Sequence, residues 1–343
     1  MNRNRLERFI EWEIKMKKIS SHVEMQRYPM LDWVRLFLAL EVMLYHYLNA
    51  VTNHQAFMFV PAVPTFLAIS GCVVLQSWDR SRSTWHFWWK RFLRIQPLLF
   101  VMFAVTFLLF GSTYFLQTIV TYLTAGYALM AGNGATWSLG AEEVAYVLLM
   151  LGVYASYYRK QALIICCLCV FATVSIVLDT SHKGVSPLAW IRGYSELAAA
   201  FLFGNLVYLN KGRAIAISQE YGWWLLVPAL LHSLIWKTFG FHSHIENASS
   251  IFVVCTTLLW AIGAKAPRLR SDFSYSIYLW HGPAITFVLI INHVSGHNNF
   301  EYTSLAFTLT LLLSLTSWYL IEKPALSFKD FRLRQPSLTG MTQ

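Results

Sequence analysis

The sequence contains few charged residues: Asp, Glu, Lys and Arg together make up only 13% of its 343 residues. Soluble domains carry about 25%, so charge is scarce in this chain. Hydrophobic residues make up 56%, and apolar runs long enough to cross a bilayer recur along nearly the whole length. We therefore interpret the chain as an all-α, polytopic integral membrane protein with one membrane domain.

Two further absences exclude other classes of protein. The net charge is +10, but the Lys and Arg residues lie between the apolar runs rather than in one basic patch with interleaved aromatics, so we expect no nucleic-acid partner. The cysteines all lie inside apolar runs and lack metal-ligand spacing with histidine, so we expect neither disulfides nor a metal. They are Cys72, Cys166, Cys167, Cys169 and Cys255.

The first thirty residues mix charges of both signs with scattered apolar residues. They contain no continuous apolar stretch that ends in a small-residue cleavage site, so we do not interpret them as a signal peptide. We expect residues 1–30 to form a cytoplasmic tail that ends where Pro29 interrupts the pattern.

About ten transmembrane helices are predicted from the apolar runs. The stretch 113–131 is also apolar, but it contains Thr, Gln and Tyr and precedes Gly132, Asn133 and Gly134, so we expect it to be re-entrant or interfacial. The predicted spans are 34–50, 57–77, 91–111, 139–157, 162–178, 189–209, 222–238, 247–264, 273–293 and 303–322.

The basic residues test this segmentation, because loops on the cytoplasmic side of a membrane carry an excess of Lys and Arg. With ten spans and a cytoplasmic N-terminus, the basic residues fall almost entirely on the inner side. We therefore predict a multi-pass membrane protein with both termini cytoplasmic, a membrane domain over 31–326 and a C-terminal tail over 327–343. The inner basic residues are Arg80, Arg82, Lys90, Arg159, Lys160, Lys211, Arg213, Lys265, Arg268, Arg270, Lys323, Lys329, Arg332 and Arg334.

The first predicted helix carries polar residues at a depth where charge is costly. Asp32 and Arg35 lie at its inner end, Glu41 in its middle and His46 further out. Arg35 and His46 are eleven residues apart, which places them on one helix face about 16 Å apart along the axis. Asp32 and Arg35 could be a simple interfacial ion pair, and His46 could be a packing residue, but a neutral imidazole is also the usual general base.

Two arginines enter the third predicted helix after an aromatic, basic loop. Arg91 and Arg94 are three residues apart and therefore lie on one face. Two guanidiniums in this position could bind a phosphate-bearing ligand that arrives from the cytoplasm. The alternative is that they anchor the helix by snorkelling, which suits Arg91 better than the deeper Arg94.

Further polar residues lie in the fourth, ninth and tenth predicted helices. Glu142 opens the fourth helix, either to favour the helix dipole or, at the outer level of His46, to pair with that imidazole. His281 lies near the middle of the ninth helix before a Gly-Pro step, where it could line a substrate passage or satisfy freed backbone groups. Glu322 ends the tenth helix, where we favour a charge-paired helix stop.

Six motifs resemble the acyltransferase-3 family of bacterial membrane acyltransferases, which add acyl groups, commonly acetyl, to surface carbohydrates. In the family's order, the motifs are LDWVRLFLALEVMLYH, FLAISGCVV, KRFLRIQP, WSLGAEEVAY, SYSIYLWH and YLIEKPAL, and together they cover residues 31–326. The resemblance implies a role for His46 in acyl transfer, for Arg91 and Arg94 in engaging the acyl donor, and for Glu142 in the active site. It adds Trp137, Ser138 and Tyr275 as site candidates.

The chain departs from the family pattern at three positions. Relatives commonly read Leu-Asp-Gly-Leu-Arg-Gly where this chain has Trp33 and Phe37, and Gly140 replaces a usual serine. The two aromatic residues enlarge the first helix near the presumed donor site, which leaves the choice between acetyl and longer acyl donors open. We expect no fused extracytoplasmic domain after the tenth helix, so the membrane domain acts alone or with a separate periplasmic partner.

The resemblance implies an O-acyltransferase of the bacterial inner membrane that holds no bound cofactor and uses acyl-CoA as co-substrate. Acyl-CoA would dock its phosphates against Arg91, Arg94 and Arg35, and His46, oriented by Glu142, would act as base or as transient acyl carrier. The acceptor would be a lipid-linked or surface polysaccharide such as O-antigen. The alternatives are a transporter or flippase for polysaccharide intermediates and a catalytically silent scaffold.

Overall fold

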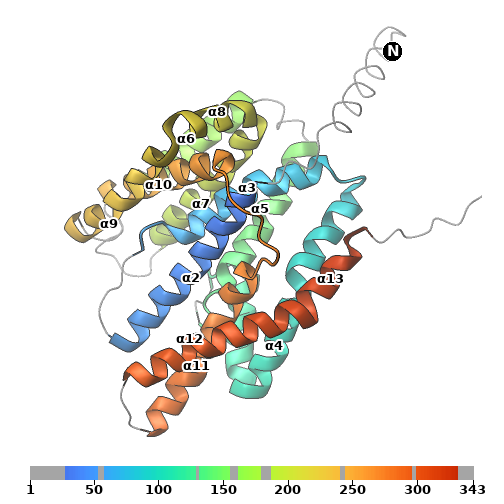
Figure 1. The fold of residues 1–343 in the computed structure, drawn as a ribbon, viewed down its shortest axis with the longest axis vertical. Coiled ribbons are helices and arrows are strands. Elements are labelled where there is room, and N and C mark those ends of the chain that lie inside the picture. Colours follow the sequence, from blue (N-terminus) through green and yellow to red (C-terminus); the bar gives the residue numbers. More distant parts are fainter. Residues whose placement is uncertain are drawn as a thin grey trace, which may run out of the picture.

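The computed structural model describes residues 28–52, 58–128, 131–154, 161–178, 187–239, 244–295 and 299–330. In these ranges the regular structure is helical throughout, as predicted (Figure 1). The longer helices are α2 (Pro29–Thr52), α3 (Ala62–Asp79), α4 (Thr84–Leu123), α5 (Thr136–Tyr154), α6 (Gln161–Val177), α7 (Pro187–Leu209), α8 (Lys211–Tyr221), α9 (Val227–Phe239), α10 (His244–Gly263), α11 (Ser274–Ser295) and α12 (Asn299–Ser317). Three short helical turns, η2 (Gly222–Leu226), η3 (Trp318–Glu322) and η4 (Phe328–Asp330), and α13 (Lys323–Ser327) complete the described helices.

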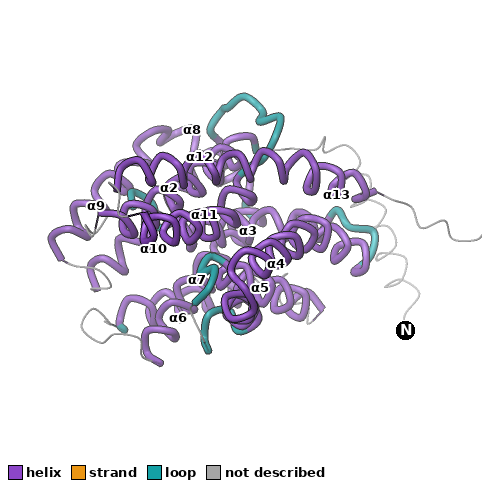
Figure 2. The backbone as a smooth tube through the Cα atoms, turned by 90° about the horizontal axis from the view of Figure 1, so that it is seen from below, coloured by secondary structure: helices purple, strands orange, loops and turns teal. Residues whose placement is uncertain are grey.

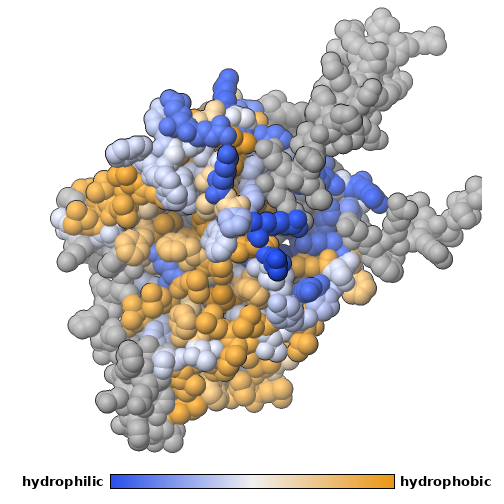
Figure 3. Space-filling view, in the orientation of Figure 1, coloured by the Kyte–Doolittle hydropathy of each residue, from blue (hydrophilic) through white to orange (hydrophobic). Residues whose placement is uncertain are grey.

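Four helical segments in the described part of the chain are long and apolar enough to cross a membrane. They are Thr84–Leu123, His244–Gly263, Ser274–Ile291 and Ser304–Ser327, and α6 is apolar but shorter. Large apolar side chains are exposed on many other helices as well, and apolar residues cover much of the surface that faces the viewer in Figure 3. The protein is therefore an all-helical membrane protein, while the count of ten spans remains a prediction.

Helix α4 is a hairpin rather than one continuous rod. Gly111 adopts φ 80°, ψ −178°, a conformation open mainly to glycine, and it breaks the helical path. Beyond Gly111 the chain runs back along the first arm, since Phe115 contacts Phe103 and Phe107, and Tyr122 also contacts Phe103. The stretch predicted to be re-entrant or interfacial is thus the helical return arm of this hairpin as far as Leu123.

The centre of the bundle is formed by close packing of α3 against α7, with α2, α10 and α11 beside them (Figure 2). Gly71 of α3 faces the backbone of Phe201, and Gly204 of α7 faces the backbone of Ala68, so that a Cβ at either glycine would overlap a carbonyl oxygen. Small residues let helix backbones approach closely where lipid supplies no hydrophobic driving force. This close contact keeps α3, which carries part of the site, at a defined position.

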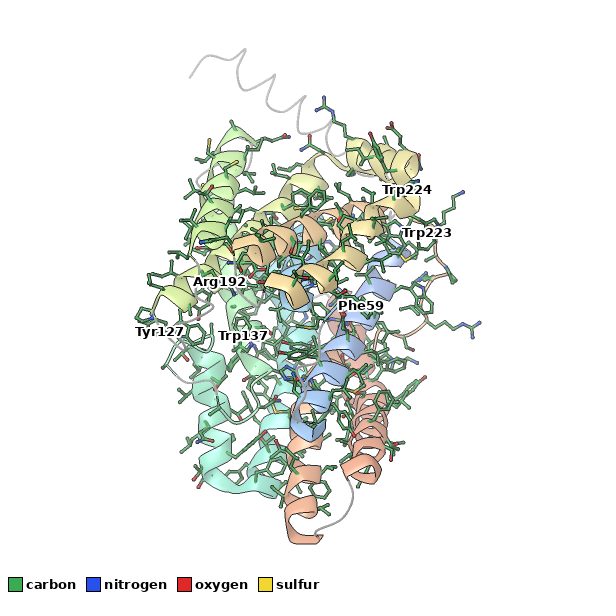
Figure 4. The ribbon with its side chains drawn as sticks, turned by 90° about the vertical axis from the view of Figure 1, so that its left-hand side faces the viewer. Phe59, Tyr127, Trp137, Arg192, Trp223 and Trp224 are labelled. Atoms are coloured by element: carbon green, nitrogen blue, oxygen red, sulfur yellow. The ribbon has the colours of Figure 1, made fainter. Side chains whose placement is uncertain are left out.

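The region between the sixth and seventh predicted spans differs from expectation. Residues taken as a loop form α8, a separate short helix that ends where Gly222 adopts φ 51°. The predicted span 222–238 is then divided into η2 and α9. The signal that was missed is the mixture of polar and small residues in KGRAIAISQEY, which is too polar to span lipid but can form a helix on a surface. Trp223 and Trp224 extend outward beside it (Figure 4), as aromatic residues do at membrane interfaces.

Candidate functional site

A cleft of about 960 Å³ opens between α2, α3, α4, α5 and the segment that precedes α11. We call it the basic cleft, because eight basic and three acidic side chains line it. They are Arg35, Arg80, Lys90, Arg91, Arg94, Arg268, Arg270 and Lys329, with Asp32, Glu142 and Asp272. The excess of positive charge makes the cleft suitable for a polyanionic ligand.

A smaller cavity of about 50 Å³ adjoins the basic cleft. The two share five lining residues, namely Arg35, Ser70, Leu139, Glu142 and Tyr275, and the smaller cavity adds Ser138, Ser274 and Tyr278. It therefore extends the polar surface from the arginines toward the middle of α11. This small cavity is the inner end of the path that a ligand in the cleft would follow.

Arg94 and Arg35 are held by carboxylates on the far side of the cleft. Arg94 donates to Asp272 at 2.5 Å, and Arg35 lies 3.5 Å from the same carboxylate. Burial raises the pKa of Asp272, but Arg94 and Arg35 outweigh this and hold the pKa well below its usual range. Glu322, which is 3% exposed in the π-helical turn η3, also interacts electrostatically with both arginines.

Arg91 lies on the same side of the cleft as Arg94, as their spacing predicted, but it has different neighbours. Its guanidinium donates to the hydroxyl of Ser77 at 3.3 Å and lies 6.0 Å from the ring centroids of both Phe87 and Tyr146. No carboxylate pairs with Arg91 among the described residues. Arg91 is therefore better placed than Arg94 to receive an anionic ligand.

Glu142 lies in both cavities beside Arg35, which corrects the expectation that it lies level with His46. Its Oε1 atom accepts hydrogen bonds from the hydroxyls of Ser70 and Tyr146. In the described residues these are its hydrogen-bond donors, and no contact with His46 is present. The error arose because α5 was assumed to start at the outer surface, whereas the chain enters α5 deep in the bundle, after the α4 hairpin.

The entry to α5 is fixed by polar contacts to the hairpin. Glu143 accepts from Gln96 at 2.7 Å and from the hydroxyl of Tyr122 at 2.6 Å. Gly140 lies so close to the carbonyl of Tyr122 that a Cβ would overlap it. Glycine at position 140 therefore lets α5 contact the return arm directly.

His46 and His281 stack on each other, with ring centroids 5.2 Å apart and an angle of 21° between the rings. We call them the histidine pair. His281 is 2% exposed, whereas the side chain of His46 is exposed on its other side. The Nδ1 atom of His281 lies 2.6 Å from the carbonyl of Tyr278; since a carbonyl only accepts, Nδ1 carries the proton and Nε2 keeps its lone pair.

Tyr278 connects the histidine pair to the small cavity. The centroid of its ring lies 5.7 Å from the centroid of the His281 ring, and its hydroxyl oxygen lies 2.7 Å from the hydroxyl oxygen of Ser138. Both Tyr278 and Ser138 line the small cavity. A file of polar side chains therefore runs from the basic cleft to the histidine pair, and the side chain stacked on His46 is His281 rather than Glu142.

The remaining candidates divide into two groups. Asp32 and Tyr275 line the basic cleft, and the hydroxyl of Tyr275 donates to the carbonyl of Ile95 at 2.8 Å. Trp137 lies on α5, half-buried against the core outside the lining of both cavities (Figure 4). Phe37 is 49% exposed and, like Trp33, lies outside these linings, but Trp33 donates to the carbonyl of Pro267 in the segment before α11. Counted along LDWVRL, the second glycine of the family pattern corresponds to Leu36, so the departure assigned to Phe37 was misplaced.

Several site residues were not recognised from the sequence. Asp272 is predicted only to precede a helix, although it pairs with Arg35 and Arg94. Glu322 is predicted to be a helix stop, although it interacts electrostatically with the same two arginines. Arg268 and Arg270 were used only to orient the chain in the membrane. Their position in one short loop, immediately before the SYSIYLWH motif, is the signal that could have identified them.

Comparison with known proteins was consistent with this geometry. A family model described as an acyltransferase domain matches residues 28–321. "Nodulation protein 10" of Rhizobium leguminosarum bv. viciae is 26% identical, over 87% of this chain and 93% of the relative. "O-acetyl transferase" of Shigella phage Sf6 is 25% identical, over 85% of this chain and 94% of the relative. No solved structure matches the chain.

Proposed function

Since the chain belongs to this acyltransferase family and is a membrane O-acyltransferase, we propose that it transfers an acetyl group from cytoplasmic acetyl-CoA to an extracytoplasmic carbohydrate. The relative named as an O-acetyl transferase supports acetyl as the group moved. The basic cleft supports a donor rich in phosphate. The file of side chains from the cleft to the histidine pair is the observation that carries the proposal.

The donor would enter from the side of the membrane that carries the basic residues. We propose that this side is cytoplasmic, with both termini there, because Lys and Arg accumulate on the cytoplasmic side of inner-membrane proteins. The phosphates of acetyl-CoA would occupy the basic cleft beside Arg91. The pantetheine arm would extend past Glu142 into the small cavity and carry the thioester toward Tyr278 and His281.

The histidine pair would perform the proton transfer. The acceptor hydroxyl oxygen attacks the thioester carbonyl carbon, His46 removes the hydroxyl proton, and the carbon–sulfur bond breaks to leave an acetyl ester and CoA. The proton passes from His46 to the CoA sulfur, which leaves as the thiol. His281, with its tautomer set by the carbonyl of Tyr278, holds the ring of His46 by stacking.

A covalent variant of this reaction is compatible with the same geometry. His46 would attack the thioester carbon first, and the carbon–sulfur bond would break to form an acyl-imidazole and release CoA as the thiol with the proton lost from the ring. The acceptor hydroxyl oxygen would then attack the acyl carbon, which breaks the carbon–nitrogen bond, forms the ester and returns the hydroxyl proton to His46. In this route the pantetheine arm spans the distance of about 16 Å along α2 between Arg35 and His46, so that the thioester carbon reaches the imidazole. A single-turnover experiment without acceptor distinguishes the routes, because only the covalent one leaves labelled protein.

The test is transfer of labelled acetyl from acetyl-CoA to lipid-linked or surface glycan, with the protein in proteoliposomes. Wild-type protein is expected to label the glycan, and His46→Ala is expected to lower the rate about 100-fold or more. His244→Ala removes an exposed histidine at the start of α10 and serves as the control that retains activity. Movement of glycan without label would instead favour a transporter and contradict the proposal.

A further inference from the structure

The segment between α10 and α11, residues 264–273, crosses the mouth of the basic cleft. We call it the strap. It is the orange segment that runs over the front of the bundle in Figure 1. Arg268, Leu269 and Arg270 line the cleft, whereas Lys265 is exposed outside it. Hydrophilic side chains gather over this part of the surface in Figure 3.

The strap is anchored at both of its ends. Near its start, the indole nitrogen of Trp33 on α2 donates to the carbonyl of Pro267 at 2.8 Å. At its end, Asp272 binds Arg94 and also accepts from the backbone nitrogen of Ser274 at 3.2 Å, which caps α11. The two arginines that line the cleft therefore lie between two fixed points rather than in a free loop.

The arginines of the strap differ in charge compensation from those deeper in the cleft. Arg35 and Arg94 share Asp272, with Glu322 nearby. Arg268 and Arg270 are exposed and form no ion pair with any residue that the structure describes. Exposed guanidiniums at the mouth of a cavity are suited to bidentate binding of a phosphate.

Resting on the proposed function, we propose that Arg268 and Arg270 bind the ribose 3′-phosphate of the CoA donor, and that Trp33 positions them by holding the strap. The 3′-phosphate is a terminal phosphomonoester at the end of CoA remote from the thioester, so it must lie at the mouth when the thioester reaches the small cavity. The diphosphate lies further along the molecule and would reach Arg91.

The experiment compares acetyl-CoA with 3′-dephospho-acetyl-CoA as donors in proteoliposomes. Wild-type protein is expected to have a KM about 10-fold or more lower for acetyl-CoA, because charge-assisted hydrogen bonds to the phosphate are lost with the dephospho donor. The double variant Arg268→Gln, Arg270→Gln is expected to raise the KM for acetyl-CoA to that of the dephospho donor. Its KM for the dephospho donor and its kcat should be unchanged.

Two further variants separate positioning from charge. Lys265→Gln removes a positive charge from the same strap outside the cleft and should leave both KM values unchanged. Trp33→Phe keeps an aromatic ring but removes the N–H donor, so the KM for acetyl-CoA should rise about 3-fold or more while kcat and the KM for the dephospho donor stay constant.

The possible results are distinguishable. If wild-type protein uses acetyl-CoA but does not discriminate between the donors, or if the double variant retains the discrimination, the role of the strap is overturned and the proposed function stands. If acetyl-CoA gives no labelled glycan, the proposed function fails and the strap proposal fails with it. An equal rise in KM for both donors would show general electrostatic attraction rather than binding of the 3′-phosphate, and would also overturn the proposal.

Discussion

Two buried clusters of arginine and carboxylate in this molecule have similar chemistry but different surroundings. In the first, Arg94 pairs with Asp272 beside the basic cleft. In the second, Arg192 of α7 lies 3.1 Å from Glu196 and donates to Asn247 of α10 at 3.0 Å. Figure 4 shows Arg192 on α7. Glu196 of this second cluster borders a void of about 20 Å³.

A buried charge in a membrane protein therefore does not by itself identify an active site. Both arginines are compensated by carboxylates, as their burial requires. The second cluster joins α7 to α10, because Glu196 also accepts from the hydroxyl of Ser250 at 2.5 Å. The first cluster also joins helices, but it faces a cavity large enough for a nucleotide. The neighbouring cavity, rather than the charge, marks the site.

The largest expected effect comes from replacing each cluster by apolar residues of similar size. Arg94→Met with Asp272→Leu should leave the protein folded, since apolar replacement of a buried ion pair is often neutral. It should lower the rate of acetyl transfer about 100-fold, because the donor is no longer held in its reactive position in the cleft. The matched double variant Arg192→Met, Glu196→Leu should fold and keep its rate within about 3-fold.

Labelled acetyl transfer and the yield of monodisperse protein measure the two effects separately. Equal losses of rate in the two double variants would remove the distinction between the clusters. Retained transfer in the Arg94, Asp272 variant would show that the first cluster is only structural.

The second prediction concerns the helix that carries Glu142 into the cleft. Gly140→Ala should lower the free energy of unfolding by about 1–3 kcal/mol, because the added methyl group overlaps the carbonyl of Tyr122 and overpacks the contact. Gly134→Ala is the control, since a Cβ there meets open space and should change stability little. Thermal unfolding in detergent measures both. A neutral Gly140→Ala would mean that α5 does not depend on this close contact.

The sequence was sufficient for the fold class because low charge and repeated apolar runs leave few alternatives to a helical membrane protein. Helical spacing predicted that Arg91 and Arg94 share one face of a helix, and both line the basic cleft together with Arg35. The sequence failed for Glu142, because the depth at which α5 begins depends on how the α4 hairpin turns at Gly111. No local pattern records that turn.

Local sequence patterns also could not predict which arginines and carboxylates form ion pairs. Arg94 and Asp272 are 178 residues apart, and their contact depends on α4 and α11 packing in the same bundle. Arg192 and Glu196 are four residues apart and could have been recognised as an i, i+4 pair. Only the packing of α10 shows that this pair lies away from the cleft.

The smallest expected effect lies at the link between the small cavity and the histidine pair. Tyr278→Phe removes the hydroxyl that contacts Ser138 but keeps the ring against His281, so the rate of acetyl transfer should fall about 3- to 10-fold, as expected for one hydrogen bond. Tyr194→Phe removes a hydroxyl of α7, near Arg192, that donates to the carbonyl of Ala125 at 2.8 Å. It removes one hydrogen bond, as Tyr278→Phe does, so the two variants should change the free energy of unfolding by similar amounts. Tyr194→Phe should leave the transfer rate unchanged. A loss of transfer in Tyr194→Phe, with none in Tyr278→Phe, would place the reaction path on α7 and reverse the assignment of the two regions.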